Sequence, residues 1–364
     1  MQIRLKNNIS IRLMGKNKKA SSKPMVSICT PTFNRRPFIP MIIKCFENQT
    51  YPKDKMEWII IDDGTDKIED LVAHIPQVKY LKYEEKMTLG HKRNLLNENA
   101  KGDIIVYMDD DDYYPPERVM HAVETLRGAP NALCAGSSIM FIYFKHISKM
   151  IQFGPYGPNH ATAATFAFKK ELLKITRFDE KSSVAEEKKF LKDYTIPFVQ
   201  LDPKKSILVF SHEQNSFDKK ELLAQGLHSR MQESSLVPTD FIKEQDILKF
   251  FTDDINNLIS YEPGKIENKP DVMKQLVEMT QSRESMIREQ MKKQVESASH
   301  NIQNKMNEMS FIIQQLTIEN GQLLDKVKYL EDKIKQIVSE RIKEKTQQKY
   351  ITLSPDGPII DSTL

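Results

Sequence analysis

The feature that most constrains the fold is a regular alternation of short apolar runs and helix-patterned segments from Met25 to about Gln200. The apolar runs are rich in β-branched residues and end at polar clusters, which is typical of buried strands. They occupy residues 26–30, 57–61, 78–82 and 103–108, with helical patterns at 38–49, 65–74 and 88–100. This alternation predicts an α/β domain in which a mostly parallel sheet carries helices on both faces.

A run of four acids, Asp109, Asp110, Asp111 and Asp112, directly follows the last of these apolar runs. Ligands of such sheets bind beyond the carboxyl ends of the strands, so the run lies where a site is expected. Four adjacent carboxylates repel one another and need a compensating cation to stay ionised. Hard oxygen ligands select Mg²⁺ or Mn²⁺, often shared with substrate phosphates. The alternative is a solvated helix N-terminus, because two prolines and a glutamate follow at 115–117.

Charge and cysteine usage narrow the class of protein. Residues 1–24 contain seven Lys and Arg and no acid, so the formal net charge of +4 combines a +7 tail with a body of −3. We expect a solvated basic tail that contacts a membrane at most peripherally, and no specific nucleic-acid site. The three cysteines do not indicate a disulfide framework, and no signal-peptide stretch is evident. These features predict a cytoplasmic protein.

The C-terminal region has a seven-residue apolar repeat and, between Pro270 and Pro355, a single glycine. The repeat has two sets of positions on one face of the expected helix, here called the seam. The first set is Ile302, Met309, Leu316, Leu323, Leu330 and Ile337, and the second is Met306, Ile313, Asn320, Val327 and Ile334. Ten of these eleven are apolar, which predicts a left-handed coiled coil. A single Asn in the seam favours a parallel homodimer. A lone helix packed on the body is the alternative.

These patterns divide the chain into five expected parts. We expect a basic tail at 1–24, a catalytic domain at 25–225 and a helical bridging segment at 226–270. An amphipathic stretch at 241–259 lies within that segment and is expected to brace the catalytic body. A coiled coil at 271–349 and a flexible tail at 350–364 complete the chain.

Five ordered motifs resemble the family-two glycosyltransferases, which are inverting enzymes of the GT-A fold. The motifs are VSICTPTFNR at 26–35, WIIIDDGTDK at 58–67, LGHKRNLLNENAKGDIIVYMDDDD at 89–112, ATFAFKKELL with RFDE at 164–180, and AEEKKF at 185–190. The resemblance covers about residues 25–215. It implies a metal-dependent, hexosyltransferase-like enzyme that moves a sugar from a nucleotide sugar to an acceptor hydroxyl of a glycan, protein or lipid.

The resemblance also implies roles for residues of the donor site. Thr30, Pro31, Thr32 and Asn34 would form the wall beside the nucleotide, and Lys92 and Arg93 would contact the base or diphosphate. Asp63 would accept a hydrogen bond from the base, which suits the N3–H of uracil and favours a UDP-sugar, with GDP as the alternative. Asp109 and Asp110 would face the ribose. For Lys92 and Arg93 a solvated helix face is the alternative.

The metal and catalytic roles come from the same resemblance. Asp111 would hold Mn²⁺ or Mg²⁺ between the phosphates, helped by Asp109 and by a late histidine, His212. Glu187 would be the general base that deprotonates the acceptor, with Glu186 as the second candidate and His160 on the acceptor side. The alternative for the two glutamates is an ordinary exposed helix start.

Two other functions remain open from sequence. A nucleotidyltransferase would use a glycine-rich loop after the first strand to cradle a triphosphate, and the PTFNRR segment here contains no glycine. The other alternative is a coiled-coil scaffold with a degenerate catalytic domain. Retention of both acidic motifs and of the arginine-containing helix argues against that reading.

Overall fold

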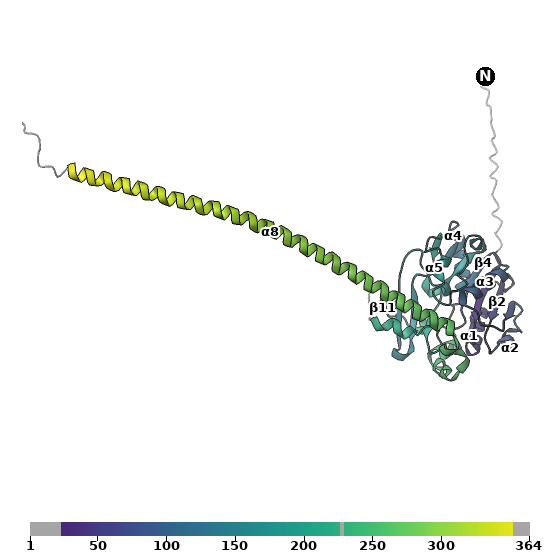
Figure 1. Ribbon diagram of the computed structural model, residues 1–364. Coiled ribbons are helices and arrows are strands. Elements are labelled where there is room, and N and C mark those ends of the chain that lie inside the picture. Colours follow the sequence, from purple (N-terminus) through teal and green to yellow (C-terminus); the bar gives the residue numbers. More distant parts are fainter. Residues whose placement is uncertain (1–22, 226–228, 352–364) are drawn as a thin grey trace, which may run out of the picture. The chain divides into compact units, whose positions relative to one another are not determined.

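The computed structural model describes residues 23–225 and 229–351 (Figure 1). The chain divides into two units, Met1–Thr280 and Gln281–Leu364. The expected basic tail, apart from its last two residues, and nearly all of the expected C-terminal tail lie outside the described residues. The expected bridging segment at 226–270 is not separate, because its described part belongs to the first unit.

A seven-stranded sheet of order β3-β2-β1-β4-β8-β5-β9 forms the centre of the described part of the first unit. Its strands are β1 (Val26–Thr32), β2 (Met56–Asp62), β3 (Val78–Lys82), β4 (Ile104–Tyr107), β5 (Cys134–Gly136), β8 (Ala167–Lys169) and β9 (Phe198–Gln200). All neighbouring pairs are parallel except those of β8, which runs antiparallel to β4 and β5. The predicted α/β class is therefore confirmed.

Buried side chains on both faces of this sheet explain why its strands are almost continuously apolar. On β2, Trp58 and Ile60 belong to one hydrophobic cluster, and Ile59 and Ile61 belong to the other. Helices α1 (Ile39–Glu47) and α4 (Arg118–Gly128) contribute to the first cluster, and α3 (Leu89–Asn99) and α5 (Glu187–Phe190) to the second. A sheet covered on both faces offers ligands only its edges and strand ends.

A second, four-stranded sheet has the order β10-β6-β7-β11. It contains β6 (Met140–Phe144), β7 (Lys149–Phe153), β10 (Val209–Ser211) and β11 (Met231–Ser234). The expected amphipathic stretch forms α7 (Gln245–Thr252), whose Phe251 ring stacks on Phe210 of β10 with centroids 4.3 Å apart. This stretch therefore packs against the second sheet.

Short helices complete the first unit. The α-helical turns are α2 (Glu69–Val72) and α6 (Pro238–Phe241). The 3-10 turns are η1 (Arg36–Phe38), η2 (Lys53–Lys55), η3 (Lys145–Ile147), η4 (Ala163–Thr165), η5 (Lys170–Lys174), η6 (Pro203–Lys205), η7 (Lys219–Gln225), η8 (Asp254–Ser260), η9 (Glu262–Gly264) and η10 (Ile266–Asn268). Turns η1 and η10 directly adjoin Arg35 and Lys269 along the chain, two residues of the pocket described below.

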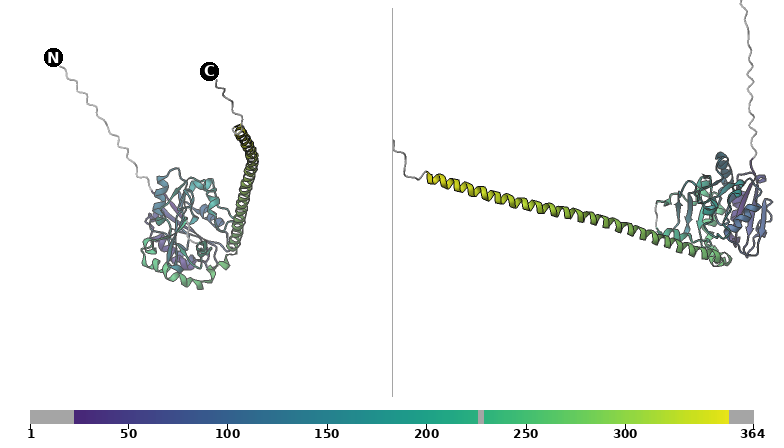
Figure 2. Two further views of the ribbon diagram at one scale, coloured as in Figure 1. Left: turned by 90° about the vertical axis from the view of Figure 1, so that its left-hand side faces the viewer. Right: turned by 45° about the horizontal axis from the view of Figure 1, so that its top comes forward.

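One continuous helix, α8 (Pro270–Ile351), runs from the first unit through the described part of the second (Figure 2). Each of the ten apolar seam residues of its heptad repeat is at least half exposed. Such exposure is unusual for a helix without a partner, because apolar side chains favour burial. Over residues 23–225 and 229–351, no helix is both long and apolar enough to cross a membrane.

Candidate functional site

A pocket lies at the carboxyl ends of β1 and β4, where the sheet topology predicts a ligand site. It is lined by Pro31, Phe33, Arg35, Lys86, Met87, Leu89, Lys92, Asp109, Asp110, Asp111, Ser183, Ser216, Lys269, Asp271 and Val272. Four of these residues are basic and four are acidic. A pocket with both kinds of charge suits a ligand that carries phosphates together with polar hydroxyl groups.

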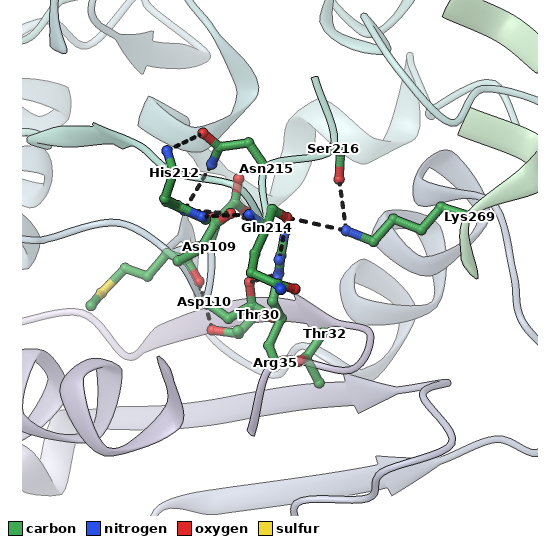
Figure 3. A network of polar contacts seen from close by, with 12 residues as sticks. Thr30, Thr32, Arg35, Asp109, Asp110, His212, Gln214, Asn215, Ser216 and Lys269 are labelled. Atoms are coloured by element: carbon green, nitrogen blue, oxygen red, sulfur yellow. Dashed lines mark hydrogen bonds and ion pairs between the residues drawn. The ribbon is translucent and has the colours of Figure 1, made fainter. Parts of the chain in front are cut away.

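Basic side chains of the protein itself neutralise much of the acidic run. The guanidinium of Arg35 lies 3.1 Å from Oδ2 of Asp111. It also lies 3.5 Å from Oδ1 of Asp110 (Figure 3). Arg93 lies 3.3 Å from Oδ2 of Asp109. The expected compensating cation is thus supplied in part by arginine, because side chains from β1's loop and α3 converge on the end of β4.

The three carboxylates that line the pocket differ in charge state. Burial raises the pKa of Asp109, and burial together with the neighbouring Asp111 raises the pKa of Asp110 to about 7. Burial acts in the same direction on Asp111, but nearby positive charge, chiefly that of Arg35, outweighs it and lowers the pKa of Asp111 far below its usual value. Asp111 is therefore the most readily ionised of the three carboxylates.

The expected metal ligands are only partly brought together. Oδ2 of Asp111 and Nε2 of His212 lie 3.6 Å apart, whereas Asp109 faces Arg93. Among the side chains of the described chain, no group of three or more His, Cys, Asp or Glu is arranged to hold a metal ion. Burial keeps the pKa of His212 well below its usual value, so the imidazole stays neutral. Nε2 of His212 also contacts Nδ2 of Asn215 at 2.7 Å. A divalent ion held by Asp111 and His212 would replace that contact and take its other ligands from phosphates.

The wall predicted after the first strand is only partly present at the pocket. Pro31 lines the pocket as expected. Thr30 instead points into the core, where its hydroxyl donates to the carbonyl of Met108 at 2.7 Å and accepts from Nε1 of Trp58 at 2.8 Å. Because alternate residues of a buried strand face opposite sides, Thr30 holds β1 against its neighbours and does not face a nucleotide.

Thr32 and Asn34 also lie behind the pocket lining, and both are buried. Asn34 has a positive φ of 53°, and its Oδ1 accepts from the backbone N–H of Asp66 at 3.0 Å. Asn tolerates this left-handed conformation better than most residues. The expected contact of Asn34 with the nucleotide is replaced by a structural role, which is to set the turn that presents Arg35.

Asp63 differs from its expected role as a base acceptor. Its side chain is fully buried, with Oδ1 2.7 Å from Nζ of Lys92 and Oδ2 2.6 Å from the backbone N–H of Met87. Both carboxylate oxygens are therefore occupied within the fold. Lys92 does line the pocket, so Asp63 contributes by holding this cation in place.

Arg93 does not line the pocket, in contrast to the expected contact with the base or diphosphate. Its Nε lies 2.7 Å from Oε1 of Glu186, and its guanidinium also stacks over the ring of Tyr107 at 4.5 Å. Because the other side of the guanidinium reaches Asp109, Arg93 joins the two acidic motifs. Buried arginine is suited to this task, since its planar group makes several directed hydrogen bonds.

The two glutamates of the second acidic motif differ in their surroundings. Glu186 is buried and bound by Arg93, whereas the structure gives Glu187 no ion pair within 4 Å among the described residues. Burial and the charge of Glu186 raise the pKa of Glu187 to about 7. Ala185, directly before them, has a strained positive φ of 53°. Such strain in a non-glycine residue is often found at functional sites.

His160 lies in a small aromatic cluster near this motif. Its ring centroid is 4.9 Å from that of Tyr156 and 5.0 Å from that of Tyr194. Burial raises the pKa of the Tyr194 phenol, and the nearby charge of Glu187 raises it further. The structure therefore places His160 against Tyr194, which lies near Glu187, and its acceptor-side role stays a prediction.

Sequence reasoning missed Arg35 and Lys269 as pocket residues. Arg35 directly follows Asn34 in the loop after the first strand. Because ligands bind beyond the carboxyl ends of such strands, this position could have identified Arg35 as a pocket residue. Lys269 is more than 50 residues from any expected pocket residue, and only the folding of the C-terminal segment brings it to the pocket. Burial and the nearby Arg35 lower the pKa of Lys269 to about 7.

Comparison with known families identifies the domain that carries this pocket. Residues 27–176 match the model of the family described as Glycosyl transferase family 2. This region contains β1 to β4, the acidic run and β8, but ends before Glu186 and Glu187. The part of the chain that carries the acidic run is therefore similar to this family over residues 27–176.

Individual relatives are similar over a limited region. A 131-residue stretch, or 36% of this chain, is 27% identical to 42% of an uncharacterized glycosyltransferase of Haemophilus influenzae. A further stretch of 101 residues, 26% of this chain, is 28% identical to 18% of the poly(ribitol-phosphate) beta-N-acetylglucosaminyltransferase TarS of Staphylococcus aureus. The chain spans less than half the length of these curated relatives.

Two solved structures are also similar at low identity. A mannosyltransferase from Pyrobaculum calidifontis, in complex with GDP-Man and Mn²⁺, is 19% identical, with a TM-score of 0.42, over 52% of this chain and 57% of that chain. TarS residues 1–349 in complex with UDP-GlcNAc is 20% identical, with a TM-score of 0.40, over 52% of this chain and 59% of that chain.

Proposed function

We propose that this protein is a metal-dependent, inverting glycosyltransferase that moves a sugar from a nucleotide sugar to an acceptor hydroxyl. The observation that carries the proposal is the contrast between Glu186, held by Arg93, and Glu187, whose pKa is raised to about 7. A general base works best when its pKa lies near the working pH. Glu187 meets this condition and Glu186 is already engaged, so we assign the base to Glu187.

The reaction follows from these positions. The acceptor oxygen forms a bond to the anomeric carbon, the bond from that carbon to the phosphate oxygen breaks, and the acceptor proton passes to Glu187. The nucleoside diphosphate leaves on the opposite face, which inverts the anomeric configuration. Arg35 and Lys92 line the pocket and favour the negative charge that develops on the leaving group.

A divalent cation is part of this proposal. Asp111 and His212 would hold it, and when bound it would supply positive charge to the departing diphosphate. Arg35 lies against Asp111 and keeps this carboxylate ionised, which is the state that a metal requires.

Experiment must decide which nucleobase the donor carries. Asp63, the residue expected to bind the nucleobase, is instead bonded to Lys92 and to the backbone N–H of Met87. Purified protein with Mn²⁺ is incubated with a panel of UDP- and GDP-sugars, and release of nucleoside diphosphate is measured. We expect slow hydrolysis of at least one donor. Absence of both binding and release across the panel would favour the non-catalytic scaffold, and release of pyrophosphate from a nucleoside triphosphate would favour a nucleotidyltransferase.

We further propose that the protein is a homodimer joined by a parallel coiled coil of α8. The ten apolar seam residues are at least half exposed in the single chain, so a second copy would bury them. Asn320 interrupts the seam once, and a polar residue at one such position fixes the register and number of strands.

A further inference from the structure

The segment at residues 258–275, here called the C-terminal strap, is bonded to two loops beside the pocket. Nε2 of Gln214 donates to the carbonyl of Leu258 at 2.9 Å, and Nδ2 of Asn34 donates to the carbonyl of Pro263 at 2.9 Å. A Cβ atom on Gly264 would lie 1.9 Å from Oε1 of Gln214, so a larger residue there would force this side chain to move. These contacts fix the strap beside the pocket, and three of its residues, Lys269, Asp271 and Val272, line the pocket.

The first turns of α8 continue this attachment on the opposite side of the pocket. Oδ2 of Asp271 accepts from the hydroxyl of Ser183 at 2.5 Å, and its other oxygen is bound by Lys86. Oε1 of Gln275 accepts from the backbone N–H of Ser183 at 2.8 Å. Ser183 lies three residues before Glu186, so the start of α8 is fixed to the loop that carries the second acidic motif.

Lys269 lies between these two attachments and is directed into the pocket (Figure 3). Its side chain is only 3% exposed, and its Nζ lies 3.4 Å from the carbonyl of Gln214 and 3.5 Å from the hydroxyl of Ser216. Both contacts are at the long limit of a hydrogen bond. Among the described residues, no carboxylate lies within 4 Å of this ammonium group. A buried cation with such weak partners is costly unless a ligand completes its shell.

We propose that Lys269 binds the diphosphate of the donor and that the contacts of the C-terminal strap position Lys269 for this role. The inference rests on the proposed glycosyltransferase function. Arg35, Lys92 and Lys269 line the same pocket from three separate parts of the chain. Together they place three cations in the pocket beside the acidic run, and an ammonium group with free donors is a suitable ligand for phosphate oxygens. The start of α8 is therefore part of the donor site.

The test is titration calorimetry of the full chain with UDP and with GDP in the presence of Mn²⁺. Lys269→Met should weaken binding of the preferred diphosphate at least tenfold, while Lys269→Arg retains most of the affinity. The matched control is Lys265→Met, which removes an exposed lysine of the same strap that is paired with Glu262. It should leave the affinity unchanged.

Two further measurements separate ligand binding from a structural role. The nucleoside without phosphates should bind wild type and Lys269→Met equally, and the melting temperature of Lys269→Met should not fall, since an unpaired buried charge is removed. Unchanged diphosphate affinity in Lys269→Met, or equal loss for the nucleoside, would overturn the inference. Failure of the wild-type chain to bind either diphosphate would instead contradict the proposed function.

Discussion

Nε of Arg93 lies 2.7 Å from Oε1 of Glu186, and both side chains are almost fully buried. Through this contact α3 connects the acidic run after β4 to the second acidic motif, because Arg93 also reaches Asp109. The two motifs are more than 70 residues apart in sequence. One buried guanidinium therefore sets the distance between the donor pocket and the candidate base.

Replacing Arg93 tests this connection. Arg93→Met should lower the free energy of unfolding by about 3–5 kcal/mol, because it leaves Glu186 buried without a partner. Urea denaturation measures the change. The double variant Arg93→Met/Glu186→Gln should recover part of the loss, since it removes the orphaned charge as well. A double variant less stable than the single one would contradict the pairing.

Glu187 should control the pH dependence of transfer. Its pKa is raised to about 7, so the carboxyl is protonated and inactive as a base at lower pH. We expect kcat/KM to rise with pH through an inflection near 7 and then to level off. Glu187→Gln should reduce turnover by about 10²–10⁴-fold, the usual contribution of a general base. Its neighbour Lys188 is exposed, and Lys188→Gln serves as the control with an unchanged profile.

Asp111 should determine the metal dependence. Asp111→Asn is expected to lose nearly all turnover, because the variant lacks the ionised carboxylate that Arg35 favours. Binding of Mn²⁺ in the presence of nucleoside diphosphate, followed by electron paramagnetic resonance, should weaken in parallel. Asp103, which lies before β4, provides a control as Asp103→Asn. Wild-type activity in Asp111→Asn would contradict the assignment.

The seam of α8 should determine the oligomeric state. Leu316→Glu combined with Leu323→Glu places charges at two seam positions and should convert a dimer to a monomer in sedimentation experiments. Gln322→Glu adds a charge one residue away from the seam and should leave the dimer intact. A double variant that sediments like the wild type would show that the seam does not join the copies.

His160 should affect the acceptor more than the donor. His160→Ala removes the ring between Tyr156 and Tyr194 and is expected to lower transfer to glycan acceptors about tenfold, while donor hydrolysis stays unchanged. The exposed His74 supplies the matched control as His74→Ala. An equal fall in hydrolysis and transfer would contradict an acceptor-side position.

The local parts of the fold could be predicted because they depend on patterns that neighbouring residues carry. The apolar runs predicted β1 to β4 within two residues at each end, since strands buried on both faces must be apolar throughout. The acidic run was expected at a strand end, and the structure places Asp109, Asp110 and Asp111 there. Pro31 and Lys92 were likewise expected at the pocket and line it.

Side-chain direction and long-range pairing were beyond the reach of the sequence. Thr30 and Asp63 belong to the expected motifs, yet they bond to Trp58 and Lys92 inside the fold. A motif identifies which residues lie near a site, but the packing of the strand decides which of them face the ligand. For the same reason Arg93 was expected at the diphosphate and is found between the two acidic motifs.

The sequence by itself determined the α/β class, the acidic motifs and the long C-terminal helix, because periodicity and strand ends are local properties. Only the tertiary structure decided the charge states of the carboxylates and the place of Lys269, because burial and long-range contacts set both. Lys269 lies over 150 residues beyond the acidic run, yet it shares the same pocket wall. That proximity depends on how the C-terminal strap packs on Asn34 and Gln214, which no local pattern specifies.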